Sequence, residues 1–326
     1  MKVFEFLQDQ VKILRDLKID EKLFSDAFDL VLSELKNSKK ATPRERCRSV
    51  LAEIFGPKNF TTDDLLNVRD KVHFTSLKPF LERFWKRFHV NVTVSGNITP
   101  EETEEEGRKL VNFVNRNLGY DQTEKEKNFS PVPKTSFKNK LEAEKNLSTD
   151  KKRVLRAKKP LIFEFQQNTH TDNCVIVYFQ TDFFKTPEKE AWCREETLTN
   201  FQNLLWHFMF NQIRTVETLG YYVVTQKEIL GGASGLSFLV QSQKKPELVE
   251  ERIFHALEMF RVKLVEEKRD SLLQFFDRCL SPKSEEMRQL IVRCRFVPEG
   301  SQAATRDSTP NVFTDVHALR TVLETE

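Results

Sequence analysis

The segment from Asn211 to Val224, NQIRTVETLGYYVV, holds the residues of this chain with the clearest chemical potential. An arginine fork can hold a backbone carbonyl or a carboxylate, and a tyrosine hydroxyl can donate a hydrogen bond to an oxygen that gains negative charge during a reaction. Arg214 and Tyr221 are therefore candidates for supporting a reaction. The residues alone favour a simpler interpretation, in which Arg214 caps a helix and Tyr221 packs in a strand.

A complete active site does not stand out in the sequence. A zinc hydrolase needs two histidines one helical turn apart and a carboxylate that activates water. Neither HExxH nor the inverted HxxEH occurs, and the nearest sequence, HALEM, has His255 and Glu258 but Met259 where the second histidine would stand. We interpret HALEM as a packed helix face. Since GxSxG, Walker A and Rossmann patterns are also absent, the sequence predicts no metal site and no cofactor site in this chain.

The composition limits the partners and the compartment. The chain has 326 residues, enough for about two domains, and its 52 basic residues nearly balance its 49 acidic ones. A net charge of +3 gives no reason to expect nucleic acid or an anionic membrane as the main partner. No apolar run reaches the ~18 residues of a membrane span, and charges interrupt the N-terminal segment as they would not in a signal peptide. The five cysteines form no CxxC pair, which predicts free thiols in a reducing compartment such as the cytoplasm.

Residues 1–120 have mostly helical periodicity, with Thr99 as a helix cap and one strand predicted by the alternation of Val90, Val92 and Val94. From residue 121 to 159 the chain is rich in lysine and poor in large apolar residues, which predicts a linker. Its basic end, KKRVLRAKK, resembles a nuclear-import or nucleic-acid patch. We favour a solvated linker, because no aromatic residues that could stack on bases are interleaved with the charges.

Residues 160–294 mix strands and helices and predict an α+β domain. LIFEF, NCVIVYFQT, YYVVTQKEI and GLSFLVQS are predicted strands, and a long helix precedes the third of them. Arg214 then falls at the end of that helix, Gly220 lets the chain turn, and Tyr221 opens the strand, with Tyr222 facing the opposite side. Residues 295–326 are small, polar and irregular, and predict a disordered tail.

Three ordered segments carry a family resemblance: RTVETLGYYVV with GLSFLVQS and YFQTD, then VTVSGNIT, then IDEKLFSDAFDLVLSELKN. Over roughly residues 20 to 268 the chain resembles the C-terminal half of the insulysin-type M16 metallopeptidases. Such enzymes are clamshells of four homologous α+β domains, with the zinc motif in the first. The resemblance implies two M16-type (LuxS/M16-like) α+β domains. The first, residues 1–120, would be mostly helical and incomplete at its N-terminus; the second, residues 160–294, would be a sheet with packed helices, incomplete at its C-terminus.

The resemblance also implies roles for Arg214 and Tyr221, whose family counterparts project towards the zinc-bound peptide. The domain that would carry zinc has no counterpart here, so we expect a half that encloses peptide substrates and is not catalytic by itself. Its expected partners are a peptide, an M16 N-terminal half or a second copy of the chain, and neither nucleic acid nor a membrane. The alternative is a stand-alone scaffold that binds peptides or proteins without hydrolysing them.

Overall fold

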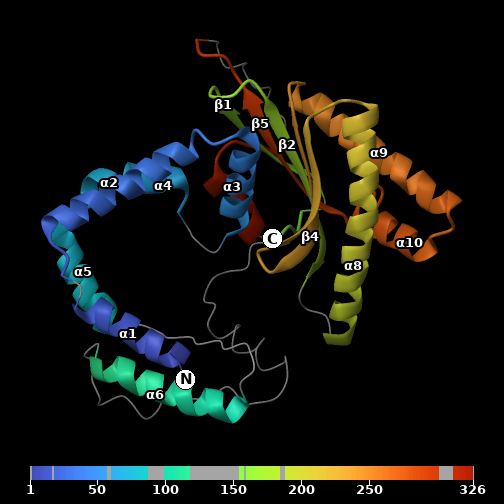
Figure 1. The fold of residues 1–326 in the computed structure, drawn as a ribbon. Helices are drawn as coiled ribbons and strands as arrows, with labels where there is room; N and C mark the ends of the chain where they lie inside the picture. Colours follow the sequence, from blue (N-terminus) through green and yellow to red (C-terminus); the bar gives the residue numbers. More distant parts are fainter. Residues whose placement is uncertain are drawn as a thin grey trace. The chain divides into compact units, whose positions relative to one another are not determined.

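A computed structural model describes most of the chain as two compact units. The described residues are 2–16, 18–56, 60–86, 99–117, 154–157, 159–183, 188–300 and 311–325. One unit comprises residues 1–35 with 64–149, and the other comprises residues 36–63 with 150–326. Arg214 and Tyr221 lie in the second unit, which is coloured mostly green to red in Figure 1. The predicted strand around Val92 and most of the predicted linker, residues 121–159, lie outside the described residues.

The first unit is helical in its described part. Its elements are α1 (Lys2–Asp16), most of α2 (Glu21–Ser38), most of α4 (Thr62–Asn67), the 3-10 turn η1 (Arg69–Lys71), α5 (Phe74–Lys86) and α6 (Pro100–Asn117). The predicted cap of α6 is confirmed: the amide of Glu102 donates to Thr99 Oγ1 over 3.2 Å, and the amide of Thr99 donates to Glu102 Oε2 over 2.9 Å. This reciprocal pair satisfies amides that the first helical turn leaves unpaired.

The second unit is built on a six-stranded sheet of order β3-β4-β2-β5-β1-β6. The strands are β1 (Leu161–Gln167), β2 (Asn173–Phe183), β3 (Tyr222–Leu230), β4 (Ala233–Ser242), β5 (Arg288–Phe296) and β6 (Val312–Phe313). The pairs β3–β4, β4–β2 and β2–β5 are antiparallel, whereas β1 is parallel to both β5 and β6. This mixed sheet with packed helices confirms the predicted α+β class.

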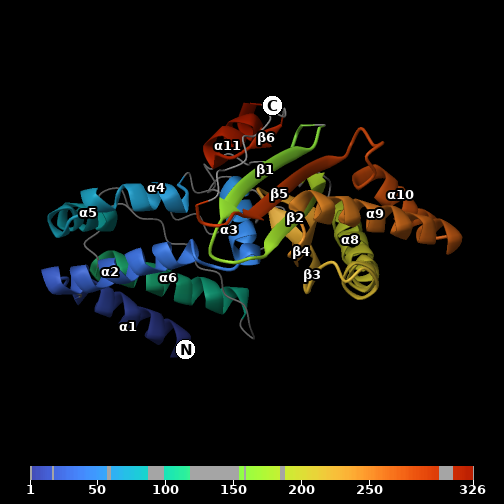
Figure 2. The same cartoon turned by 90° about the horizontal axis from the view of Figure 1, so that it is seen from above.

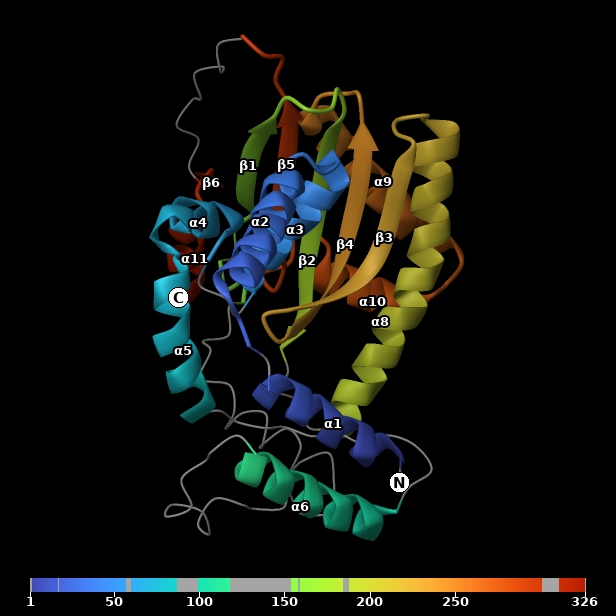
Figure 3. The ribbon, with the colours of Figure 1, turned by 60° about the vertical axis from the view of Figure 1, so that its left-hand side comes forward.

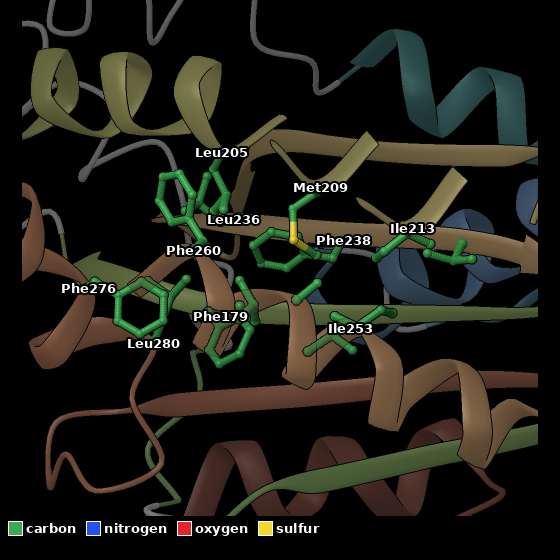
Figure 4. Packing of buried hydrophobic residues seen from close by; sticks show 14 of the residues in the cluster. Phe179, Leu205, Met209, Ile213, Leu236, Phe238, Ile253, Phe260, Phe276 and Leu280 are labelled. Carbon is green, nitrogen blue, oxygen red and sulfur yellow. The ribbon is translucent and has the colours of Figure 1, made fainter. Parts of the chain in front are cut away.

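Helices cover both faces of the sheet (Figures 2 and 3). Helices α8 (Glu188–Met209), α9 (Pro246–Glu266) and α10 (Asp270–Cys279) lie on one face, and α3 (Pro43–Phe55) and α11 (Val316–Thr325) lie on the other. Side chains of a strand point alternately to its two faces, so β2 serves two cores. Phe179 packs with residues of α8 and α9, among them Leu205 and Ile253 (Figure 4), while its neighbour Tyr178 packs with Phe55 of α3.

Helix α3 packs on the sheet although its sequence lies inside the range predicted as the first domain, residues 1–120. Its apolar side chains Cys47, Leu51, Ile54 and Phe55 are buried and contact the β2 and β5 face. They recur at helical spacing and form one stripe, which needs an apolar partner. The sheet face between β2 and β5 provides that partner, so the two units do not divide the chain at the predicted boundary.

The expectation of a disordered tail over residues 295–326 is wrong for residues 311–325. These residues form β6 and α11, and Val316, Leu319 and Leu323 are buried against the α3 side of the sheet. Their spacing is one stripe of a short helix. The guanidinium of Arg320 is also buried and donates to the carbonyl of Glu53 in α3. The surrounding polar sequence obscures this short apolar stripe.

Candidate functional site

The candidate site is the junction between α8 and β3. Helix α8 continues into η3 (Phe210–Val216), a π-helical segment whose wider turn is marked by the 3.0 Å hydrogen bond from the amide of Glu217 to the carbonyl of Gln212. Ile213 is fully buried and anchors the segment in the core shared with α9. Single π-helical turns are rare and occur frequently at functional sites, where they change the direction of a side chain.

The structure brings Arg214 and Tyr221 together. The guanidinium carbon of Arg214 lies 4.8 Å from the ring centre of Phe210 and 4.8 Å from the ring centre of Tyr221. Tyr221 is 84% exposed and precedes β3 instead of packing within it. The simpler interpretation from the sequence therefore does not describe Tyr221. Arg214 does lie in the last turn of the helical segment, but the contacts of its guanidinium are with aromatic faces.

Glu217 fixes the end of η3 to α9. Both of its carboxylate oxygens accept hydrogen bonds from the Arg252 guanidinium, over 2.7 and 2.8 Å, and Gln212 Nε2 donates a third over 2.9 Å. The hydrogen bonds from Arg252 hold the pKa of Glu217 below its usual value. A bidentate arginine–carboxylate pair restricts geometry more than a single bond does. It therefore holds the turn that carries Arg214.

Gly220 was predicted to let the chain turn, but the structure gives another reason for a glycine at this position. The left-handed backbone conformation at the junction belongs to Thr218, with a φ of 47°, and not to Gly220. At Gly220 a Cβ atom would lie 2.3 Å from the carbonyl oxygen of Gln241 and 3.2 Å from a methyl group of Val240. The glycine thus permits close approach of the junction to β4. Ser242 Oγ of β4 holds the same stretch by donating to the carbonyl of Leu219 over 2.5 Å.

A pocket of about 330 Å³ opens beside this junction. Its lining includes Arg44, Asp172, Tyr221, Tyr222, Gln241 and Lys244, and we call it the Arg44 pocket. The guanidinium carbon of Arg44 lies 4.4 Å from the ring centre of Tyr222. Tyr222 packs in the core on the α3 side, whereas Val223 packs in the opposite core, as the alternation of a strand requires. Tyr221 belongs to neither core.

Sequence reasoning missed Arg44, Gln241 and Lys244. Arg44 comes from α3, and the other two come from the end of β4 and the turn after it, so they are distant in sequence from Tyr221. Each is an ordinary polar residue in its own element, and no local spacing marks it. Only the fold brings them beside the junction.

Other chemically interesting side chains do not assemble into a site. Within the described ranges, no group of three or more His, Cys, Asp or Glu residues could hold a metal ion. In the HALEM segment of α9, Ala256 and Leu257 are the buried residues, whereas His255, Glu258 and Met259 are exposed. Burial raises the pKa of the Cys47 thiol, and Cys47 is free, as are Cys174, Cys279 and Cys294. No helix among the described residues is long and apolar enough to cross a membrane.

Comparison with known proteins finds a family and several proteins with sequences similar to this chain. The family described as PQQ synthase PqqF-like, C-terminal lobe domain 4, matches residues 201–295, a range that includes the junction. Insulin-degrading enzyme of Homo sapiens is 24% identical over 247 residues, covering 76% of this chain and 22% of that protein. Insulin-degrading enzyme of Drosophila melanogaster is 27% identical over 253 residues, again covering 76% of this chain and 22% of the relative. The chain therefore spans about a fifth of the length of these relatives.

Solved structures share the fold. The crystal structure of pitrilysin matches with a TM-score of 0.61 at 15% identity, covering 98% of this chain and 36% of the pitrilysin chain. A conserved protein from Enterococcus faecalis V583 matches with a TM-score of 0.54 at 11% identity, covering 90% of this chain and 75% of the other. Together with the sequence relatives, these matches confirm the predicted resemblance to the C-terminal half of insulysin-type M16 peptidases.

Proposed function

We propose that this chain, which is similar to the C-terminal half of insulysin-type M16 peptidases, acts as the half of a zinc metalloendopeptidase that does not bind zinc. In this proposal it helps to enclose a peptide substrate and supplies Arg214 and Tyr221 to the reacting peptide bond. The observation that carries the proposal is the contact between the Arg214 guanidinium and the ring of an almost fully exposed Tyr221, at a junction anchored on both sides. The described residues provide no ligand set for zinc, so the metal would come from an N-terminal half.

The chemistry follows from the two side chains. The hydroxyl of Tyr221 can donate a hydrogen bond to a carbonyl oxygen as that oxygen becomes negative. The Arg214 guanidinium lies over the rings of Phe210 and Tyr221, and a guanidinium that stacks on a ring keeps its N–H edge able to hold a backbone carbonyl. Because Glu217 and Leu219 are tied to α9 and β4, the backbone that presents both groups is fixed before a peptide arrives.

The test is kinetic and uses the assembled pair of halves. The chain is combined with a zinc-carrying N-terminal half of an insulysin-like peptidase, and association is verified before hydrolysis of one fluorogenic peptide is measured. We expect Tyr221→Phe to lower kcat by about 10²–10³ while association and peptide affinity change little, because the lost donor acts mainly on the transition state. Arg214→Lys should also impair turnover, since lysine lacks the planar fork.

Tyr222→Phe is the matched control. Tyr222 is the next residue and the same residue type, but it packs in the α3-side core under Arg44. Loss of the Tyr222 hydroxyl should leave kcat nearly unchanged. If Tyr221→Phe and the parent chain hydrolyse the peptide at equal rates in an assembled complex, the catalytic-support proposal is wrong and the junction is only a helix-to-strand connection.

A second candidate function is a stand-alone scaffold that binds peptides or proteins without hydrolysis. The Arg44 pocket favours it, because that pocket is formed within the second unit by residues of this chain and needs no zinc. Peptide binding by the isolated chain, with no cleavage after addition of an N-terminal half, would select this candidate. For either candidate we propose a peptide as ligand, no nucleic-acid or membrane partner, and a reducing compartment such as the cytoplasm, in keeping with the free cysteines. A homo-oligomer is the alternative to pairing with an N-terminal half.

A further inference from the structure

The Arg44 pocket has the size and charge of a site for the end of a peptide. Its volume of about 330 Å³ lies at the small end of the range for ligand pockets, and suits about one or two amino-acid residues. Two cationic residues line it, Arg44 from α3 and Lys244 from the turn before α9, together with one acidic residue, Asp172. The pocket therefore has an excess of positive charge that an anionic group can neutralise.

The carboxylate inside the pocket is already bound by a neutral partner. Gln241 Nε2 donates to Asp172 Oδ2 over 2.8 Å, which uses one acceptor oxygen without adding positive charge. Neither Arg44 nor Lys244 forms an ion pair with a carboxylate in the part of the chain that the structure describes; the contact of the Arg44 guanidinium is with the ring of Tyr222. Stacking on a ring occupies the guanidinium face, and leaves its N–H edge to bind a carboxylate.

Gln241 adds a second requirement, for an N–H donor. Its Oε1 atom is buried and accepts no hydrogen bond from any described group. A buried acceptor left without a partner is unfavourable, so a ligand that brings an N–H to the Gln241 amide is favoured over one that does not. Gln241 lines the pocket and the terminal torsion of glutamine is soft, so its amide can turn towards a ligand there. The last residue of a peptide carries an anionic carboxylate and a backbone N–H on the same Cα.

We infer that the Arg44 pocket binds the C-terminal carboxylate of a peptide, with Arg44 and Lys244 as the groups that recognise it. Tyr221 lines the same pocket, so a peptide held there by its C-terminus passes close to the Tyr221 hydroxyl. The inference deepens the proposed function and rests on it for this consequence: peptides with a free C-terminus near the reacting bond would be the preferred substrates. Binding in the pocket itself requires neither zinc nor turnover.

The experiment measures binding to the full chain without an N-terminal half. One fluorescein-labelled peptide is prepared as the free acid, as the C-terminal amide, and as an amide ending in glutamate, and Kd values are compared by fluorescence anisotropy at fixed salt. We expect the free acid to bind about tenfold more tightly than the amide, as a charge-assisted hydrogen bond implies. The peptide amide that ends in glutamate tests whether a side-chain carboxylate is accepted instead, and should bind like the plain amide because its carboxylate is not adjacent to a backbone N–H.

Arg46→Gln is the matched control for Arg44→Gln. Both arginines lie on α3 and stack on aromatic rings, Arg46 on Phe165 at 4.9 Å, but only Arg44 lines the pocket. Arg44→Gln should abolish the preference for the free acid, Lys244→Gln should reduce it, and Arg46→Gln should preserve it. Thermal melts check that all variants are folded.

Three results would overturn the inference: equal Kd values for the acid and the amide, no detectable binding of either, or equal effects of Arg44→Gln and Arg46→Gln. Tighter binding of the glutamate amide than of the free acid would also overturn it, in favour of a site for acidic side chains. These results are independent of the proposed catalytic role, because a silent Tyr221→Phe would remove that role and leave the acid preference intact.

Discussion

Replacing Gly220 with alanine tests the close approach of the junction to β4. The added Cβ would lie 2.3 Å from the carbonyl oxygen of Gln241, a distance that real Cβ atoms essentially never show. That oxygen belongs to the backbone of a central strand and cannot rotate away. The junction and β4 must therefore separate by at least about 0.7 Å to reach the 3.0 Å limit.

The cost of this separation follows from what the two backbones share. A gap of ~0.5–1 Å already forfeits a quarter to a half of the dispersion energy between packed atoms. The separation also stretches the hydrogen bond from Ser242 Oγ to the Leu219 carbonyl and the first pairing of the β3–β4 ladder, Tyr222 with Gln241. Overpacking of this kind costs about 1–3 kcal/mol, and a weakened hydrogen bond adds about 0.5–1.5 kcal/mol. We expect the free energy of unfolding of the second unit to fall by about 2–3 kcal/mol for Gly220→Ala, which lowers Tm by about 5–10 °C.

The assay is thermal unfolding followed by circular dichroism, with Gly107→Ala as the control. Gly107 lies inside α6, where an added Cβ would meet nothing within 4 Å. Alanine there should stabilise the helix by about 0.5–1 kcal/mol, because glycine is the poorer helix former. The same substitution thus has opposite expected signs at the two positions. An unchanged Tm for Gly220→Ala would refute the close-approach argument and would mean that the junction tolerates a side chain.

Three further predictions concern the junction and the core. Glu217→Gln should lower the free energy of unfolding by about 1–2 kcal/mol at pH 7, discounted for the partial exposure of Arg252. Because the folded pKa of Glu217 is depressed, the stabilisation by Glu217 is present above the usual pKa of 4.5 and is lost as the pH falls through the folded pKa. Urea midpoints that decline equally in acid for the parent and the variant would contradict this prediction. Thr218→Asn should raise stability by about 1 kcal/mol, since asparagine tolerates a positive φ better than a β-branched residue does, whereas Thr215→Asn should bring no gain in the same melts. A thiol reagent should label Cys47 slowly in the native chain and fast in denaturant, because burial raises the pKa of the thiol. Peptide mass spectrometry measures the labelling, and fast labelling of the native chain would place Cys47 outside the core.

The sequence indicated much of the second unit because its strands and helices have strong local patterns. β2 contains a nearly continuous run of apolar and β-branched residues, and β4 contains the shorter apolar run of residues 238–240; both strands have a neighbour on each side in the sheet. β5 was not predicted, since arginines interrupt its apolar run. The reason lies outside the strand: Arg293 Nη2 contacts Glu250 of α9 over 2.7 Å, and Arg293 Nη1 lies 3.6 Å from Glu164 of β1. A charge whose partners are distant in sequence cannot be recognised as a strand residue from local spacing.

Only those residues of the candidate site that lie in one short segment of the sequence could be predicted. Arg214 and Tyr221 belong to one short segment, and the expectation that both support a reaction comes from the family resemblance. The structure adds that the guanidinium carbon of Arg214 lies 4.8 Å from the ring centre of Tyr221. The reason for Gly220 was not predictable, because it depends on the position of β4. The sequence predicts that Gly220 lets the chain turn. In the structure the left-handed conformation belongs to Thr218, and the glycine permits the close approach to β4. Strain at Thr218 is consistent with a functional junction.

Under the proposed function, the contacts of Tyr221 give the junction a reason to need a second surface. Every neighbouring part of the segment is anchored, through buried Ile213, the Glu217 pair and the Leu219 carbonyl, but the Tyr221 ring contacts mainly Arg214. A cation–π contact at an exposed site is worth about 0.5–1 kcal/mol, which favours the stacked position by only about twofold to fivefold. The backbone of Tyr221 is thus fixed while its hydroxyl is not fully positioned. A peptide, or a second half that covers the ring, would exclude water, complete that positioning and strengthen the hydrogen bond that the hydroxyl donates. A tyrosine arranged in this way is suited to a reaction that begins only when another surface closes over it.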